Sequence, residues 1–272
     1  MEKEFYKKLK SKTLNDIACG KITYDKLDNI LRADKEVVLE AIRHESFVYY
    51  DVPENLKDDR EIVLASLKKY GLMLEFVSDE LKKDREIVFT AVKQCGFALK
   101  YANQIFKEDK EIVFEAIKSD GWALQFVGRK FLRDPNFLFS AVKYHGYAFE
   151  LLPKKYNRDK IFIEKCIKEH GYILRFIDPK LRLNYLFLEK LVKINGYCLK
   201  YIPDVYKDDL NLALVAVKQN GLSISFVEGN LRKNKEIIIE AIKQNRESYD
   251  FVDNSMKLDK DVSAAFMQYS MI

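Results

Sequence analysis

Apolar residues recur along this chain with two nested periods. Within short windows they fall three or four residues apart, the spacing of one face of an α-helix. The same arrangement of windows then returns every 25 residues from Asp34 to Leu258, with no insertion or deletion. A repeat of this length is typical of solenoids, in which each unit buries its apolar face against its neighbours.

Each repeat opens with Asp or Asn, which suits a helix N-cap because the side-chain oxygen accepts amide protons of the first turn. Apolar residues at positions 4, 5, 8 and 9 form one helical stripe, and position 8 is usually small. Position 13 is glycine in seven consecutive repeats, and we expect it to end the helix in the left-handed conformation. Ser46 and Arg246 occupy position 13 in the first and last repeats.

A second helix of six or seven residues is predicted after the glycine, with apolar residues at positions 16, 18 and 19. A capping or breaking residue at position 20 then leads into a single turn that places one more apolar side chain in the core. The sequence therefore predicts an all-α fold, an α-solenoid of nine 25-residue helix-pair repeats over 34–258. A helical cap over 1–33 and a capping helix over 259–272 complete this prediction.

Composition agrees with helices, because 10 glycines and 5 prolines in 272 residues are few for an all-β chain. The net charge of +5 is too small by itself to indicate nucleic-acid binding. The four cysteines form no CxxC pair, and no long apolar run suggests a signal peptide or a membrane span. We therefore expect reduced thiols and a cytoplasmic protein, although an effector exported by a receptor-read tail would show the same features.

Position 10 is basic in all nine repeats. A ladder of cations there would bind phosphates or an acidic partner. The alternative, which the weak net charge favours, is that each cation complements the helix dipole or pairs with a carboxylate. The candidate binding residues of this column are Lys93, Lys118, Lys143, Lys168 and Lys193.

Position 14 carries Trp122, Tyr147, Tyr172 and Tyr197 in four consecutive repeats. Such side chains are enriched at the centres of protein interfaces and also stack on nucleic-acid bases. The alternative is that they pack in the core, one helical turn before position 18. Our hypothesis is that the three tyrosine hydroxyls reach solvent.

Position 12 carries Cys95, Asp120, His145 and His170, residue types that bind metals. Stacked helices lie about 9 Å apart, which exceeds the reach of one tetrahedral site, so no metal site is expected. No HExxH, GxSxG or glycine-rich phosphate loop is present. The sequence therefore predicts no catalytic residue, no cofactor and no enzymatic activity.

The strings DREIVFTAVKQCGFALKYANQIFKED at 84–109 and DKEIVFEAIKSDGWALQFVGRKFLRD at 109–134 show the repeat most clearly. They share the opening Asp, Glu-Ile-Val, an apolar pair before Lys, the Gly and a following Ala-Leu. In these features the chain resembles the family catalogued as domain of unknown function 4116, over about four-fifths of its length. The resemblance supports the repeat prediction and implies no activity.

The leading hypothesis is a non-enzymatic scaffold that binds a protein partner along an extended surface. Positions 7, 11, 17, 21 and 22 vary and are expected to set its specificity. The alternative is single-stranded nucleic-acid binding, which requires the lysine and aromatic columns on one face. The sequence does not decide which row of helices forms the concave face. Position 14 lines that face if the second helices lie inside, and positions 3, 6, 7 and 10 line it if the first helices lie inside.

Overall fold

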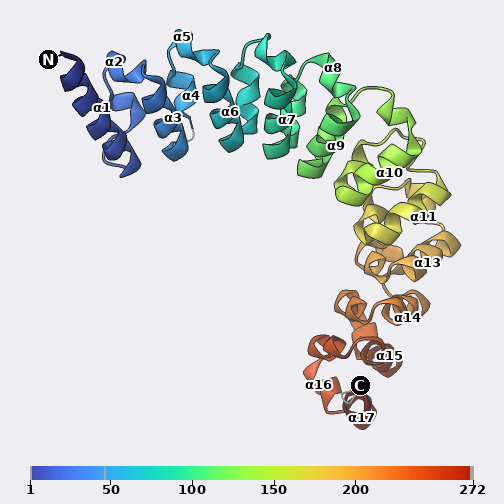
Figure 1. Ribbon diagram of the computed structural model, residues 1–272. Helices are drawn as coiled ribbons and strands as arrows, with labels where there is room; N and C mark the ends of the chain where they lie inside the picture. The colour runs from blue at the N-terminus through green and yellow to red at the C-terminus, as the bar shows by residue number, and fades with distance from the viewer. Residues whose placement is uncertain (1, 46, 270–272) are drawn as a thin grey trace. The chain divides into compact units, whose positions relative to one another are not determined.

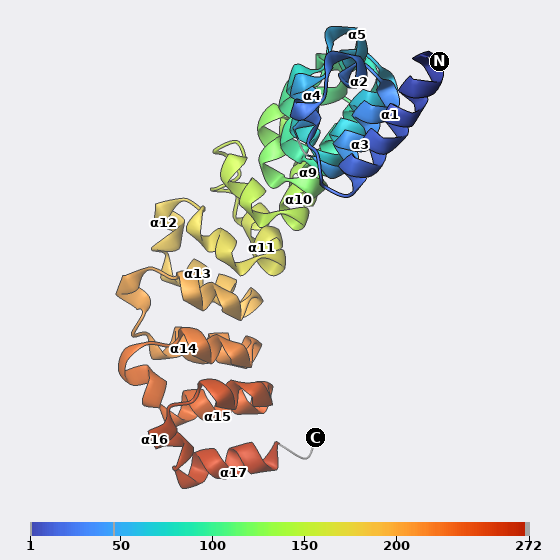
Figure 2. The same cartoon turned by 90° about the vertical axis from the view of Figure 1, so that its left-hand side faces the viewer.

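The computed structural model describes residues 2–45 and 47–269, so Ser46 at position 13 of the first repeat lies outside the described residues. Within these ranges the chain contains α-helices and short 3-10 helices and no strand (Figures 1 and 2). The prediction of an all-α solenoid of tandem repeats is confirmed. The chain divides into two compact units, one ending at Asp134 and the other beginning at Pro135.

Each repeat begins with a ten-residue α-helix directly after its Asp or Asn. The helices of the first unit are α3 (Lys35–His44), α6 (Arg60–Lys69), α7 (Arg85–Gln94) and α9 (Lys110–Ser119). Those of the second unit are α10 (Pro135–Tyr144), α11 (Lys160–Glu169), α13 (Tyr185–Ile194), α14 (Leu210–Gln219) and α15 (Lys235–Gln244).

The N-cap prediction is confirmed wherever the structure gives a cap. In the second repeat Oδ1 of Asp59 accepts the backbone amides of Glu61 at 3.0 Å and Ile62 at 3.2 Å. Asn184 does the same with a side-chain amide oxygen, which accepts from Phe187 N at 2.9 Å. The first residue of each repeat therefore fixes where its helix starts.

The predicted second helix is a 3-10 helix in every repeat but the first. The 3-10 helices are η2 (Gly71–Phe76), η4 (Gly96–Tyr101), η5 (Gly121–Phe126), η7 (Gly146–Leu151), η8 (Gly171–Arg175), η9 (Gly196–Tyr201), η11 (Gly221–Phe226) and η13 (Arg246–Phe251). The first repeat has α4 (Val48–Asp51) in this place.

A single turn closes most repeats, as predicted. These turns are α5 (Glu54–Lys57), η3 (Leu81–Lys83), α8 (Gln104–Lys107), η6 (Phe131–Arg133), α12 (Pro179–Arg182), η10 (Asp204–Tyr206), η12 (Gly229–Lys233) and α16 (Asn254–Lys257). Three elements precede the first repeat: α1 (Glu2–Ala18), η1 (Tyr24–Lys26) and α2 (Asn29–Arg32). After the ninth repeat comes α17 (Lys260–Gln268), and we propose that these end segments cap the solenoid.

The core lies between the row of first helices and the row of 3-10 helices. In α7 the predicted stripe of Ile87, Val88, Ala91 and Val92 is completely buried, as is Leu99 of η4. Every repeat uses the same positions, so the core continues from one repeat to the next within each unit.

The repeat glycines are not left-handed, and that prediction was wrong. Among the described residues only Gly20 and Gly229 have positive φ. A Cβ atom on Gly96 would instead lie 2.0 Å from the carbonyl oxygen of Ala116 in the next repeat. For Gly196 the corresponding contact is 2.4 Å to the carbonyl oxygen of Ala216. Glycine is needed here because the backbones of successive repeats touch.

This contact explains the last repeat, where Arg246 replaces glycine. The following helix α17 carries Phe266 at position 8, which is Ala, Ser or Cys in every repeat except that of Leu191. The guanidinium of Arg246 lies 4.7 Å from the centre of the Phe266 ring. At this junction a cation–π contact thus replaces the contact between a glycine and the carbonyl of the next repeat.

Position 11 secures the same junction in several repeats. The amide of Gly71 donates to Oε1 of Gln94 at 2.6 Å, and Nε2 of Gln94 donates to the carbonyl of Lys69 at 2.9 Å. The amide of Gly196 likewise donates to Oε1 of Gln219 at 2.5 Å. These amide side chains satisfy backbone groups that the glycine turn leaves unpaired.

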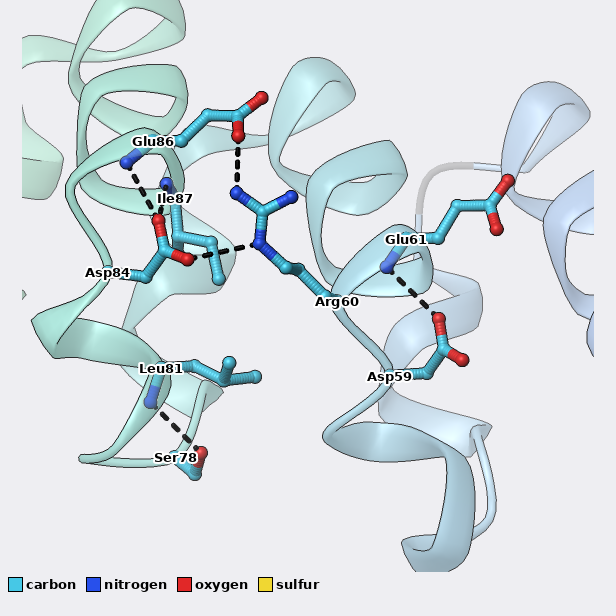
Figure 3. A network of polar contacts seen from close by, with 8 residues as sticks. All are labelled: Asp59, Arg60, Glu61, Ser78, Leu81, Asp84, Glu86 and Ile87. Carbon is cyan, nitrogen blue, oxygen red and sulfur yellow. Dashed lines mark hydrogen bonds and ion pairs between the residues drawn. The ribbon is translucent and has the colours of Figure 1, made fainter.

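A ladder of ion pairs joins successive first helices on their N-terminal side. In Figure 3 the guanidinium of Arg60 in α6 reaches Asp84 and Glu86 of the next repeat, with Nε to Oδ2 of Asp84 at 3.0 Å. The other oxygen of Asp84 caps its own helix by accepting from Glu86 N at 2.8 Å. One carboxylate therefore both starts a helix and holds the preceding repeat.

The ladder is continuous in the first unit and interrupted in the second. Lys10 Nζ lies 2.8 Å from Asp34, Lys35 Nζ lies 2.8 Å from Asp59, and Arg85 Nε lies 3.6 Å from Asp109. In the second unit Pro135 and Leu210 stand where these cations would be, and Tyr185 donates a hydroxyl to Asp209 at 3.2 Å. The pairing returns at Lys235, 2.7 Å from Asp259.

The close glycine contact predicts unequal effects of two identical substitutions. Gly96→Ala should lower the free energy of unfolding by about 1–3 kcal/mol because its methyl group meets a backbone carbonyl. Gly171→Ala should lower the free energy of unfolding by less, because the atoms nearest to its new methyl group would lie 3.1–3.2 Å away. Urea denaturation followed by circular dichroism measures both, and equal stabilities would contradict the assignment.

The ladder predicts a dependence of stability on pH. The hydrogen bond from Arg60 holds the pKa of Asp84 below its usual value, so the pairing stabilises the fold above the pKa of an unfolded aspartate. This stabilisation is lost as the pH falls through the lowered pKa of Asp84.

Arg60→Gln should therefore lower the Tm at pH 7 by at most a few degrees. The difference from wild type should shrink as the pH falls below about 4. Thermal melts between pH 3 and pH 7 test this, and a difference that stays constant over that range would refute it.

Candidate binding surfaces

The basic side chains at position 10 all lie in the last turn of their helices and are all exposed. Arg43 pairs with Glu40 at 2.7 Å and Lys118 with Glu115 at 3.6 Å, each three residues away in the same helix. Lys93, Lys168 and Lys193 make no ion pair within the described residues, and the same is true of Lys143. The column is thus a mixture of paired and unpaired cations.

Some residues of this column line surface hollows along the first helices of the first unit. One of about 720 Å³ lies between α3 and α6 and is lined by Leu39, Leu64 and Lys68 among others. Another of about 490 Å³ borders α7 and is lined by Lys68, Phe89 and Lys93. These two hollows lie on the first-helix side of the unit and position 14 lines neither of them, whereas a smaller hollow of about 250 Å³ borders η1 and α4 and is lined by Phe47 of position 14.

The position-14 aromatics lie on the opposite row, that of the 3-10 helices. They do not pack in the core: 45% of Trp122, 51% of Tyr147 and 37% of Tyr197 are exposed. Phe97, Tyr147 and Tyr197 each contact the ring at position 18 of the following repeat, and Tyr197 also lies 6.1 Å from Tyr201 at position 18 of its own. Phe97 meets Phe126 with ring centres 4.9 Å apart, and Tyr197 meets Phe226 at 4.8 Å.

Tyr172 differs from its neighbours. It is half-buried, and its ring centre lies 5.0 Å from that of Tyr147. Its hydroxyl oxygen would lie 2.3 Å from a Cβ on Gly146, so it rests against the glycine backbone. Burial raises the pKa of this hydroxyl. At position 14 of the second unit, the exposed tyrosines are therefore Tyr147 and Tyr197.

Lys200 adds positive charge to the aromatic surface of the second unit. Its Nζ lies 5.8 Å from the ring centre of Tyr197, 5.6 Å from that of Tyr201 and 5.5 Å from that of Phe226. An ammonium group over several aromatic faces is attracted to them by the ring quadrupoles. We define the aromatic surface as Tyr147, Phe176, Tyr197, Lys200, Tyr201 and Phe226.

The structure does not bring the lysine and aromatic columns together in the first unit. Lys68 and Lys93 border the hollows with Phe89, whereas Phe97 lies beside Phe126 and under Lys100 at 5.7 Å. The shared face that nucleic-acid binding would need is absent among the described residues of this unit.

Position 12 serves the turn between the two helices. Asp120 accepts from Trp122 N at 2.9 Å, and Nδ2 of Asn195 donates to the carbonyl of Ile167 at 2.9 Å. Nε2 of His170 lies 3.1 Å from the carbonyl oxygen of Lys143. In the ranges that the structure describes, no three His, Cys, Asp or Glu side chains are grouped to hold a metal ion.

Sequence reasoning missed the ion-pair ladder and the hollows of the first-helix face. The sequence contains a signal for the ladder. Position 2 is basic in each repeat whose successor begins with Asp-x-Glu, as Arg60 stands before Asp84 and Glu86. Position 6 also repeats an apolar residue at Leu39, Leu64 and Phe89, outside the core stripe.

Comparison with known proteins identifies the repeat but no activity. The sequence model described as Domain of unknown function (DUF4116) matches seven overlapping stretches, each about two repeats long. These stretches are 34–82, 59–107, 84–133, 109–157, 134–182, 184–232 and 209–257. No curated protein and no solved structure matches the chain.

No helix among the described residues is both long enough and apolar enough to cross a membrane. The matched stretches together extend over most of the 272 residues, repeat by repeat. On this basis the chain belongs to the DUF4116 family, as a tandem array of its repeats.

Proposed function

We propose that the protein is a non-enzymatic scaffold that binds a protein partner along an extended surface of its repeats. The observation that supports this most is the aromatic surface of the second unit. Exposed Tyr147 and Tyr197 are held by edge contacts with Phe176 and Phe226 of the following repeats. Rigid, half-exposed aromatic side chains are the residues that anchor protein interfaces at low entropic cost.

A reducing, cytoplasmic location is part of the same proposal. All four cysteines, Cys19, Cys95, Cys166 and Cys198, are free. Burial raises the pKa of the Cys166 thiol to about 12 and also raises that of Cys198, so both are unreactive core residues.

Photo-crosslinking tests the aromatic surface. p-Benzoylphenylalanine placed at Tyr197 should give a discrete protein adduct when the scaffold is irradiated in cells of its source. The same group at Val205, which is 73% exposed and lies outside the aromatic surface, should not. Adducts of equal yield at both positions, or none at Tyr147 and Tyr197, would contradict a partner site on this surface.

Nucleic-acid binding is tested against the same proposal by measuring the affinity for a random single-stranded RNA at two salt concentrations. We expect weak binding, because the lysine and aromatic columns lie on different sides of the first unit. Tight binding that falls steeply with salt and is abolished by replacing Lys118, Lys143 and Lys168 together would show that the lysine column binds phosphates.

A further inference from the structure

The hollows of the first-helix face form one continuous strip in the first unit. A hollow of about 480 Å³ borders α1 and α3, and it shares Lys35, Leu39 and Glu61 with the hollow between α3 and α6. That hollow in turn shares Lys68 with the one at α7. Figure 1 shows α1, α3, α6 and α7 side by side in this order. We call this strip the first-helix groove.

The floor of the first-helix groove is apolar. Leu39, Leu64 and Phe89 occupy position 6 of three successive repeats and are each half-buried. They do not belong to the core stripe, because positions 4, 5, 8 and 9 already fill it. A row of apolar side chains, one from each helix, is therefore left open to a ligand.

One edge of the groove carries carboxylates that all pair with cations, although each cation is shared by two carboxylates. Each of them pairs with a cation from the preceding repeat. Asp34 and Glu36 pair with Lys10, Asp59 and Glu61 pair with Lys35, and Glu86 pairs with Arg60. No carboxylate that lines these hollows lacks a cation.

The opposite edge carries cations without carboxylates. Lys68, Lys69 and Lys93 line the groove, and none makes an ion pair with any described residue. Arg43 at the same edge is the exception, since it pairs with Glu40 at 2.7 Å. The groove therefore has an apolar floor, one edge of ion pairs with an excess of carboxylates and one edge of uncompensated positive charge, which complements acidic side chains on that side of a ligand.

The spacing of the floor residues restricts the conformation of such a ligand. Packed helices lie about 8–10 Å apart. A polyproline II segment has three residues per turn and rises about 3.1 Å per residue, so every third side chain points the same way about 9 Å further on. We propose that the first-helix groove binds an extended acidic segment of a partner protein that carries an apolar side chain at every third residue.

This proposal deepens the proposed function and rests on it, since it names the chemistry of one protein partner. The apolar side chains pack on Leu39, Leu64 and Phe89, and the acidic side chains that point to the lysine edge pair with Lys68, Lys69 and Lys93. The ligand thereby supplies the carboxylates that this edge lacks, while the paired carboxylates of the other edge stay with their cations.

The test uses the full chain and a fluorescein-labelled peptide of five Asp-Glu-Leu triplets, with binding followed by fluorescence anisotropy. The peptide should bind, and a peptide of Asp-Glu-Ser triplets should bind at least about tenfold more weakly because it loses the floor contacts. The double variant Lys68→Glu/Lys93→Glu should weaken binding of the leucine peptide by at least about tenfold.

A matched control makes the same charge change without an apolar floor. Lys168 and Lys193 also occupy position 10 and are exposed, but position 6 of their repeats is Glu164 and Glu189. Lys168→Glu/Lys193→Glu should leave the affinity within about twofold. Circular dichroism and the Tm of both double variants show that each is folded before their affinities are compared.

Three results would overturn the proposal. These are no binding of the leucine peptide, equal weakening by the two double variants, and equal affinity of the leucine and serine peptides. Tighter binding of a 20-nucleotide oligo-dT, lost in Lys68→Glu/Lys93→Glu, would also overturn it by showing that the groove takes a nucleic acid. If the peptide fails while crosslinking at Tyr197 still yields an adduct, only the groove proposal falls and the scaffold function stands.

Discussion

The contact between the backbones of successive repeats is the constraint on which the rest of this structure depends. At Gly96 the chain passes so close to the carbonyl of Ala116 that a single methyl group would not fit. This approach brings the first helices together, closes the core between the two rows of helices and positions the polar side chains of position 11. The charged and aromatic surfaces are regular because this spacing is regular.

The parts of the fold that depend on single positions could be predicted from the sequence. The helix starts, the buried stripe and the closing turn follow from residue types at fixed intervals, and the family resemblance agreed with them. The conformation of the repeat glycines could not be predicted this way, because glycine suits both a positive φ and a close approach. Only the position of Ala116 decides between these two at Gly96.

The candidate surfaces were harder to predict because they arise between repeats. Arg60 and Asp84 are 24 residues apart, and whether Lys93 lies with Phe89 or with Phe97 depends on which side of the solenoid each helix faces. Sequence reasoning correctly singled out the basic and aromatic columns as regular features. It treated them as one possible face, whereas in the first unit the two rows of helices separate them.

The position of these contacts has a consequence for how such a chain changes length. Where the glycine, its partner carbonyl, the capping carboxylate and the bridging cation are all present, they occupy fixed positions of the repeat, as at Gly71, Ala91, Asp84 and Arg60. Duplication of such a repeat as a whole recreates these contacts at the new junction. A one-residue insertion inside a repeat shifts several of them at once, which accounts for nine uninterrupted repeats of equal length.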